Sequence, residues 1–202
     1  GDPYTQISGT DLYVAQIASF EEPFVRYSYY VWNKGSEDVT GFNLAAAADV
    51  QIADDDYAAV IVDKKSEGAN HFISMTDGTY EFRLYFAGDG ITATDTVWAG
   101  RYGSHRQSVF VDNPVNQKNI DSAIAFSWHN QTIPANGLKQ YTVMLGCGEK
   151  GSLVLTRRFA FDEDGDGVID DDEIRVVTED DIITAPDARS KDGYYFLGWN
   201  TS

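Results

Sequence analysis

Cysteine and methionine are scarce in this sequence: its 202 residues include one cysteine, Cys147, and two methionines. A single cysteine cannot form an intrachain disulfide, which excludes a small fold held together by several disulfide bonds. Cys147 lies between two glycines and outside any catalytic or metal-binding cysteine motif. We therefore expect it to be a small core residue.

Long hydrophobic runs are also missing. No stretch is long and apolar enough to cross a bilayer as a helix, and the first residues do not match a secretory signal peptide. We therefore expect no insertion into a membrane.

Basic residues are few relative to acidic ones. The chain has 15 Lys and Arg residues against 32 Asp and Glu residues, which gives a formal net charge of −17. Phosphate groups are bound mainly by Lys and Arg, so this balance argues against nucleic acid as a partner. It also argues against binding to an anionic membrane surface.

Recognisable catalytic motifs are absent. His71, His105 and His129 are far apart and lack the spacing of a zinc site. No nucleophile elbow, phosphate-binding loop or dinucleotide fingerprint is present. A glycosidase needs two carboxylates across a cleft, and nothing local selects such a pair. We predict a protein that is not an enzyme. A hydrolase remains an alternative to the two hypotheses given at the end of this section, and it would need a deep pocket with paired carboxylates.

Strand-forming residues are abundant. The sequence is 43% hydrophobic and contains 12 tyrosines, 11 phenylalanines and 18 glycines, a composition typical of β-rich proteins. Asp77-Gly78 between two alternating runs predicts a hairpin, and the alanines at 45–48 fit either a helical turn or a strand. We predict an all-β fold in which residues 1–150 form an antiparallel β-sandwich. Its expected strands are 11–17, 24–32, 39–44, 57–62, 71–75, 80–86, 97–102, 108–111, 123–128 and 140–145.

The acidic stretch 162–173 carries the clearest functional signal. Its spacing matches the twelve-residue EF-hand calcium loop, with a glycine at position 6 where the backbone must turn sharply. Without a cation, so many carboxylates in one loop would repel one another. The predicted Ca²⁺ ligands are Asp162, Asp164, Asp166, the carbonyl of Val168, Asp170 and Glu173.

The segments beside this loop read as strands. Residues 154–161 and 174–178 are rich in β-branched and aromatic residues and show no helical stripe. A strand-flanked loop favours a structural ion over the helix-opening switch of a calcium sensor. Because 13 of the 32 acidic residues fall in the last 52 positions, we place a domain boundary near 150, with a second module at 151–202.

The end of the chain resembles a known family. Ala185-Pro186 is followed by Gly193-Tyr194, Phe196 and Gly198-Trp199, a pattern similar to that of the Listeria–Bacteroides repeat. That resemblance implies a small β-grasp module of bacterial surface proteins, among them internalin-type adhesins, and hence an extracellular, secreted or cell-wall-associated location. Residues 153–202 depart from the family in two ways. An acidic loop replaces the usual short hairpin, and the sequence stops where the family continues.

Weaker features bear on a ligand of residues 1–150. Two segments, 30–39 and 121–128, are vaguely similar to β-sandwich modules of bacterial adhesin-like proteins. The acid run Asp54–Asp56 fits a solvated loop or a cation site. The cluster Arg101–Arg106 fits a receptor for an acidic sugar or carboxylate, or a loop that offsets nearby acids. Trp32, Trp98 and Trp128 could stack on sugars if exposed, although large aromatics in strands are usually core residues.

These observations lead to two functional hypotheses. The first is a calcium-binding fragment of a bacterial secreted or cell-surface protein that serves adhesion or display, with a host or surface protein or a glycan as its partner. The second is a carbohydrate-binding or accessory module of a glycan-degrading enzyme.

Overall fold

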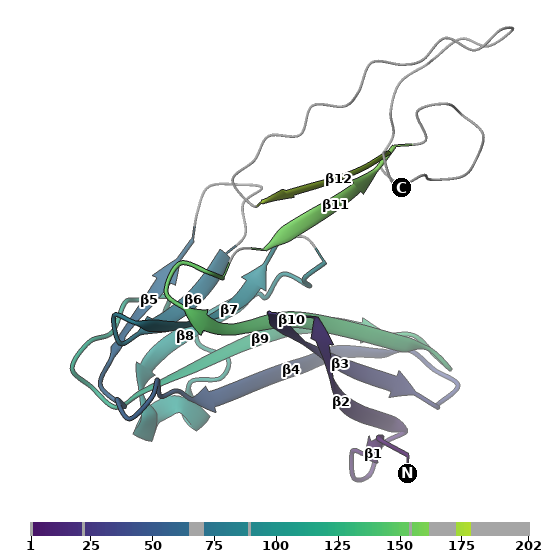
Figure 1. Cartoon of the computed structure of the whole chain (residues 1–202). Helices are drawn as coiled ribbons and strands as arrows, with labels where there is room; N and C mark the ends of the chain where they lie inside the picture. Colours follow the sequence, from purple (N-terminus) through teal and green to yellow (C-terminus); the bar gives the residue numbers. More distant parts are fainter. Residues whose placement is uncertain are drawn as a thin grey trace, which may run out of the picture. The chain divides into compact units, whose positions relative to one another are not determined.

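The chain divides into two compact units, Gly1–Leu153 and Val154–Ser202. The structure is a computed structural model that describes residues 2–21, 23–64, 71–88, 90–153, 155–161 and 173–178. Strands dominate the described residues, which include one short 3-10 helix, η1 (Tyr102–Gln107). The predicted all-β fold is confirmed (Figure 1).

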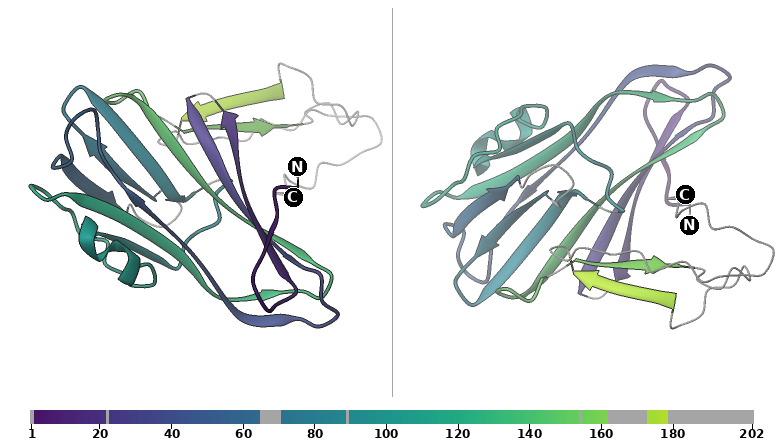
Figure 2. Two further views of the ribbon diagram at one scale, coloured as in Figure 1. Left: turned by 90° about the horizontal axis from the view of Figure 1, so that it is seen from below. Right: turned by 90° about the horizontal axis from the view of Figure 1, so that it is seen from above.

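The first unit is a sandwich of two antiparallel sheets. The larger sheet has seven strands in the order β1-β2-β3-β10-β7-β6-β5, and the smaller has three in the order β4-β9-β8. Figure 2 shows the two sheets facing each other. The larger sheet consists of β1 (Thr5–Gln6), β2 (Leu12–Glu21), β3 (Phe24–Asn33), β10 (Leu138–Glu149), β7 (Tyr80–Ala87), β6 (His71–Thr76) and β5 (Ala59–Asp63). The smaller consists of β4 (Val39–Asp49), β9 (Ser122–Ile133) and β8 (Thr96–Arg101).

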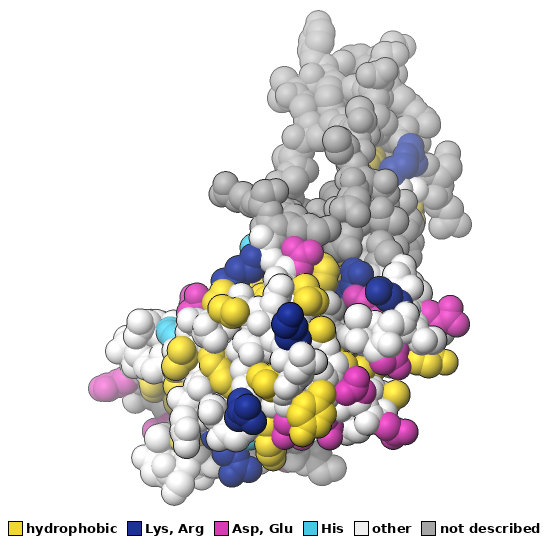
Figure 3. All heavy atoms as spheres, turned by 90° about the vertical axis from the view of Figure 1, so that its left-hand side faces the viewer, with side chains coloured by type: hydrophobic (Ala, Val, Ile, Leu, Met, Phe, Trp, Pro, Cys, Tyr) yellow, Lys and Arg dark blue, Asp and Glu magenta, His cyan; other side chains and the backbone are white. Residues whose placement is uncertain are grey.

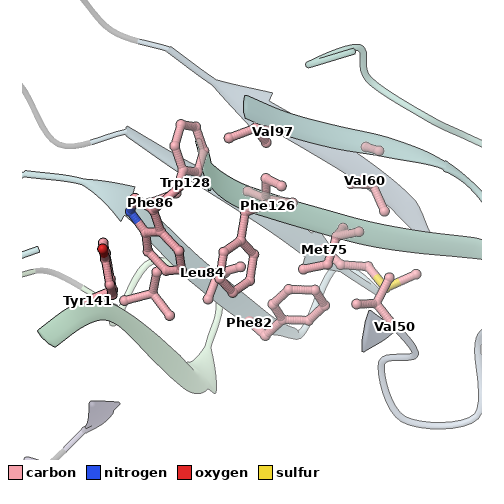
Figure 4. Packing of buried hydrophobic residues seen from close by; sticks show 14 of the residues in the cluster. Val50, Val60, Met75, Phe82, Leu84, Phe86, Val97, Phe126, Trp128 and Tyr141 are labelled. Atoms are coloured by element: carbon pink, nitrogen blue, oxygen red, sulfur yellow. The ribbon is translucent and has the colours of Figure 1, made fainter. Parts of the chain in front are cut away.

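The hydrophobic core lies between these sheets. Successive side chains of a strand point to opposite faces, so every second residue of a strand points toward the other sheet. Figure 4 shows Phe82 and Leu84 of β7 against Phe126 of β9. Trp128 is buried in the same cluster, and its indole N–H donates to the carbonyl of Thr92 at 3.1 Å. That bond lets an indole be buried without leaving an unpaired donor.

The turn between β6 and β7 has the predicted hairpin chemistry. Gly78 adopts a φ of 99°, a conformation that favours glycine. The Asp77 carboxylate accepts the amide hydrogens of Thr79 and Tyr80 at 2.8 and 2.7 Å. Hydrogen bonds from the Tyr80 and Thr79 amides lower the pKa of Asp77, because they stabilise its charged form.

The strand alternative is confirmed for the alanines at 45–48, which belong to β4. Two other parts of the strand prediction change. Residues 108–111 are not a strand, because two turns follow η1: the Ser108 amide donates to the His105 carbonyl at 3.1 Å, and the Val111 amide to the Ser108 carbonyl at 2.9 Å. The two-residue strand β1 is additional, and it is too short to leave a periodic signal.

The residues that follow β10 cover part of the outer face of the larger sheet. Leu153 is buried, and its carbonyl accepts a hydrogen bond from the Tyr85 hydroxyl at 3.3 Å. The Glu81 carboxylate is also buried, where it pairs with the Arg83 Nε at 2.6 Å and accepts the Gly151 amide at 3.2 Å. The end of the first unit is therefore tied to the middle of the sheet.

The outer face of the smaller sheet holds a second, small cluster. Trp98 is buried there with Ala123 and Ala125, and Val109 packs against them. Its indole lies so close to Gly100 that a Cβ at position 100 would overlap the ring. Gly100 is thus required by packing.

We expect Gly100→Ala to destabilise the first unit by about 1–3 kcal/mol, the usual cost of overpacking. Gly103→Ala is the matched control, because a Cβ there meets nothing within 4 Å. It should leave stability unchanged or raise it by up to about 1 kcal/mol. Urea denaturation followed by tryptophan fluorescence measures both. Equal stabilities would contradict the packing account.

Candidate functional site

The predicted calcium ligands fall mainly outside the described residues: Asp162, Asp164, Asp166, Val168 and Asp170. The structure does describe both sides of the loop. Strand β11 (Thr156–Ala160) pairs antiparallel with β12 (Ile174–Thr178), with Ala160 opposite Ile174. The Phe161 amide also donates to the Glu173 carbonyl at 3.1 Å. The predicted strands beside the loop are confirmed, and its two ends lie next to each other.

Glu173, the predicted twelfth-position ligand, is 3% exposed. Glutamate at this position supplies both oxygens to calcium in loops of this type. A buried carboxylate beside the first residue of β12 therefore fits the donor set that the ion requires.

A groove in the first unit is a second candidate site, which sequence patterns did not reveal. It consists of two adjoining hollows of about 550 and 640 Å³. Both are lined by Gln16 of β2, Tyr29 of β3 and Ala45 of β4. The groove thus runs beside β4 and over the inward faces of β2 and β3.

Small side chains explain the groove. Ala46 and Ala48 lie opposite Phe126 and Ile124 of β9, so they point toward the core. Their methyl groups do not fill the space that larger residues would occupy. The alanine run at 45–48 was the one sequence signal for this space.

Tyr29 forms part of the groove wall. Its ring centroid lies 5.8 Å from that of Trp128 and 6.3 Å from that of Phe126. Desolvation, with a smaller contribution from Tyr27, raises the pKa of Tyr29 to about 12. The phenol therefore stays neutral at physiological pH.

The first unit brings a serine and a histidine together on β9. Ser127 Oγ lies 2.7 Å from His129 Nε2 and also contacts the Thr96 hydroxyl. The nearby Asp95 carboxylate accepts the backbone amide of His129 at 2.6 Å. In a catalytic triad the carboxylate holds the imidazole ring and the serine is accessible. Here Ser127 is fully buried, so the arrangement has the geometry of a structural network.

The tryptophans do not converge on one face. Trp128 is in the core, and Trp98 is buried on the outer face of the smaller sheet. Trp32 is half-buried, with Tyr4 at 5.7 Å and the Lys34 ammonium 4.2 Å from its ring centroid. Of the three, Trp32 is therefore the tryptophan with a surface left for stacking on a sugar.

The basic cluster Arg101–Arg106 lies at the end of β8 and in η1. Tyr102 stacks on His105 with ring centroids 4.8 Å apart, and both arginines are exposed. Neither hollow of the groove is lined by this cluster. On the face shown in Figure 3, acidic, basic and hydrophobic side chains are interspersed.

The acid run Asp54–Asp56 forms part of a turn. The Asp55 carboxylate accepts the Tyr57 amide at 2.8 Å, as in an Asx turn. Within the described residues, no three His, Cys, Asp or Glu side chains are grouped closely enough to share a metal ion. No described helix is long and apolar enough to cross a membrane.

Cys147 is not the core residue that its glycine neighbours suggested. It is exposed and lines the groove, which leaves its side chain open to solvent. Desolvation by the surrounding groove nonetheless raises the pKa of its thiol.

We expect Cys147 to react slowly with iodoacetamide, because a raised pKa leaves less thiolate at neutral pH. The rate should rise with pH, with a midpoint above the ordinary value of 9.0. Unfolding in urea should accelerate the reaction at pH 8. Mass spectrometry of the alkylated chain gives the rates, and a folded-state midpoint at or below the ordinary value would contradict this assignment.

Comparison with known proteins does not assign the chain to a family. No protein-family model matches the sequence, and no curated protein is significantly similar to it. The likeness of residues 153–202 to the Listeria–Bacteroides repeat therefore stays a prediction from its motif.

Proposed function

We propose that residues 162–173 bind one Ca²⁺ ion between β11 and β12. The observation that carries the proposal is the antiparallel pairing of Ala160 with Ile174, which joins the two ends of an EF-hand-type loop. A hairpin whose ends already lie together loses less entropy when its connection closes around an ion. The ion would then favour the paired state of β11 and β12, since a ligand stabilises the state that it binds.

The protein's proposed role is that of a non-enzymatic module of a bacterial secreted or cell-surface protein, in adhesion or display. The repeat-like motif near the end of the chain supports the extracellular location, where calcium is plentiful. The β-strands beside the loop support a bracing role for the ion. Carbohydrate binding is the second candidate. It rests on the half-buried Trp32 and its neighbours Tyr4 and Tyr13.

Calcium should bind and stabilise the protein. For an extracellular module we expect a Kd of about 0.1–1 mM. At a calcium concentration 100 times the Kd, the stabilisation is about 2.7 kcal/mol, which raises the melting temperature of the second unit by several degrees. Excess EDTA should reverse the rise. Calorimetry measures heat of binding and melting together, and the absence of both effects would refute the proposal.

Two variants distinguish coordination of the calcium ion by one carboxylate from attraction of the ion by the overall negative charge of the loop. Glu173→Gln keeps the side-chain shape but removes the charge of the bidentate ligand, so it should weaken calcium binding at least tenfold. Asp171→Asn removes the same charge at loop position 10, which supplies no ligand in this pattern. It should retain binding within about threefold, the loss expected from long-range attraction alone. Equal losses in the two variants would indicate a diffuse acidic patch.

A further inference from the structure

Among the described strands of the first unit, three of the four sheet edges are covered, at least in part. Segment 112–117 runs along two of them. The amides and carbonyls of Val60 in β5 and Gln117 exchange two hydrogen bonds of 2.9 Å, and Asn113 donates to the Val97 carbonyl of β8 at 2.9 Å. On the opposite side, β1 pairs with Val14 and Tyr13 of β2. Segment 112–117 thus forms hydrogen bonds with an edge strand of each sheet on the same side of the sandwich.

The fourth edge is open. Strand β4 pairs with β9 on one side, and no described strand pairs with its other side. Register shifts near Val39 and Phe42 interrupt its first part, and irregular pairing of this kind protects an edge. From Leu44 to Asp49 the pairing with β9 is regular. This stretch presents an ordered row of backbone donors and acceptors.

The groove lies directly beside this open edge. Its hollows are lined by β4 residues from Phe42 to Asp49, and the apolar side chains of Leu84, Val143 and Leu145 line it on the larger sheet. The smaller sheet has three strands and the larger seven. The inward faces of β2 and β3 therefore extend beyond β4, where a fourth strand of the smaller sheet would lie.

An extended polypeptide matches both features. Its backbone supplies donors and acceptors at the repeat of a sheet edge, and every second side chain points the same way. A lipid or a compact apolar ligand would fill the groove but leave the edge of β4 unpaired. Six residues of regular edge correspond to roughly 20 Å of strand, which is enough for three inward-pointing side chains.

Charge selects among possible peptides. The lining of both hollows contains one charged side chain, Asp49, and no Lys or Arg. The chain as a whole carries −17. A second copy of this chain would bring the same negative charge, whereas Lys or Arg beside the apolar positions would be attracted.

We propose that the open edge of β4 and the adjoining groove bind an extended peptide segment of another protein, with apolar residues at alternate positions and basic residues beside them. The segment becomes the fourth strand of the smaller sheet, and its apolar side chains contact Tyr29, Val143 and Leu145. This site lies in the first unit and is independent of the proposed calcium loop.

The test is selection of peptide binders from a display library of random twelve-residue peptides against the full chain. We expect the enriched peptides to alternate apolar and polar residues and to be positively charged. Synthetic copies should bind with a Kd in the micromolar range, and scrambled copies at least tenfold more weakly. They should also slow alkylation of Cys147, which lines the groove.

Two substitutions in β4 locate the binding. Ala48→Leu points a larger side chain inward, opposite Ile124, and should weaken peptide binding at least tenfold. Thr40→Leu adds a larger side chain at an exposed position of the same strand that lines neither hollow, and it should change binding less than threefold. Circular dichroism and melting curves confirm that each variant is folded.

Several results would overturn the proposal. They are the absence of enriched peptides, equal effects of the two leucine variants, and binding that leaves the alkylation of wild-type Cys147 unchanged. The alkylation measurement holds even if Ala48→Leu does not fold. A wild-type dimer that Ala48→Leu converts to a monomer would identify a second copy of this chain as the occupant instead.

Discussion

The contact between β9 and the larger sheet is the interaction on which the first unit depends. Ile124, Phe126 and Trp128 point from β9 into the space between the sheets, where they meet apolar residues of β7 and β10. Burial of an aromatic or aliphatic side chain of this size contributes about 1.5–3 kcal/mol. Because β9 is the middle strand of the smaller sheet, β4 and β8 are both positioned through it. The groove beside β4 and the Trp98 cluster behind β8 are therefore consequences of how β9 packs.

The alternation of apolar and polar residues predicted most strands of the sandwich, because a half-buried strand repeats every second residue. It could not predict the sheet order. Strands β9 and β10 follow each other in sequence yet belong to different sheets, and local pattern carries no information on that choice. Segment 108–111 has the composition of a strand but forms turns, which are closed by hydrogen bonds from the Ser108 amide to His105 and from the Val111 amide to Ser108.

The two candidate sites differ in how far sequence could predict them. A calcium loop is local: twelve consecutive residues hold the ligand pattern, and the structure adds the pairing of the strands beside it. The groove is not local. It requires β2, β3 and β10 of one sheet to face β4 of the other. It also depends on the small side chains of Ala46 and Ala48. Alanine in a strand reads as a weak strand former, and the space that it leaves appears only once the opposite sheet is in place.

The anchoring of Leu153 has a mechanical consequence. The second unit begins shortly after the end of β10 in the sequence. Strand β10 is hydrogen-bonded to β3 on one side and to β7 on the other. Tension applied through the later part of the chain would reach the Gly151–Glu81 and Tyr85–Leu153 bonds first. It would then act on a central strand, which must lose its hydrogen bonds to two neighbours before it leaves the sheet. An edge strand has only one neighbour to lose.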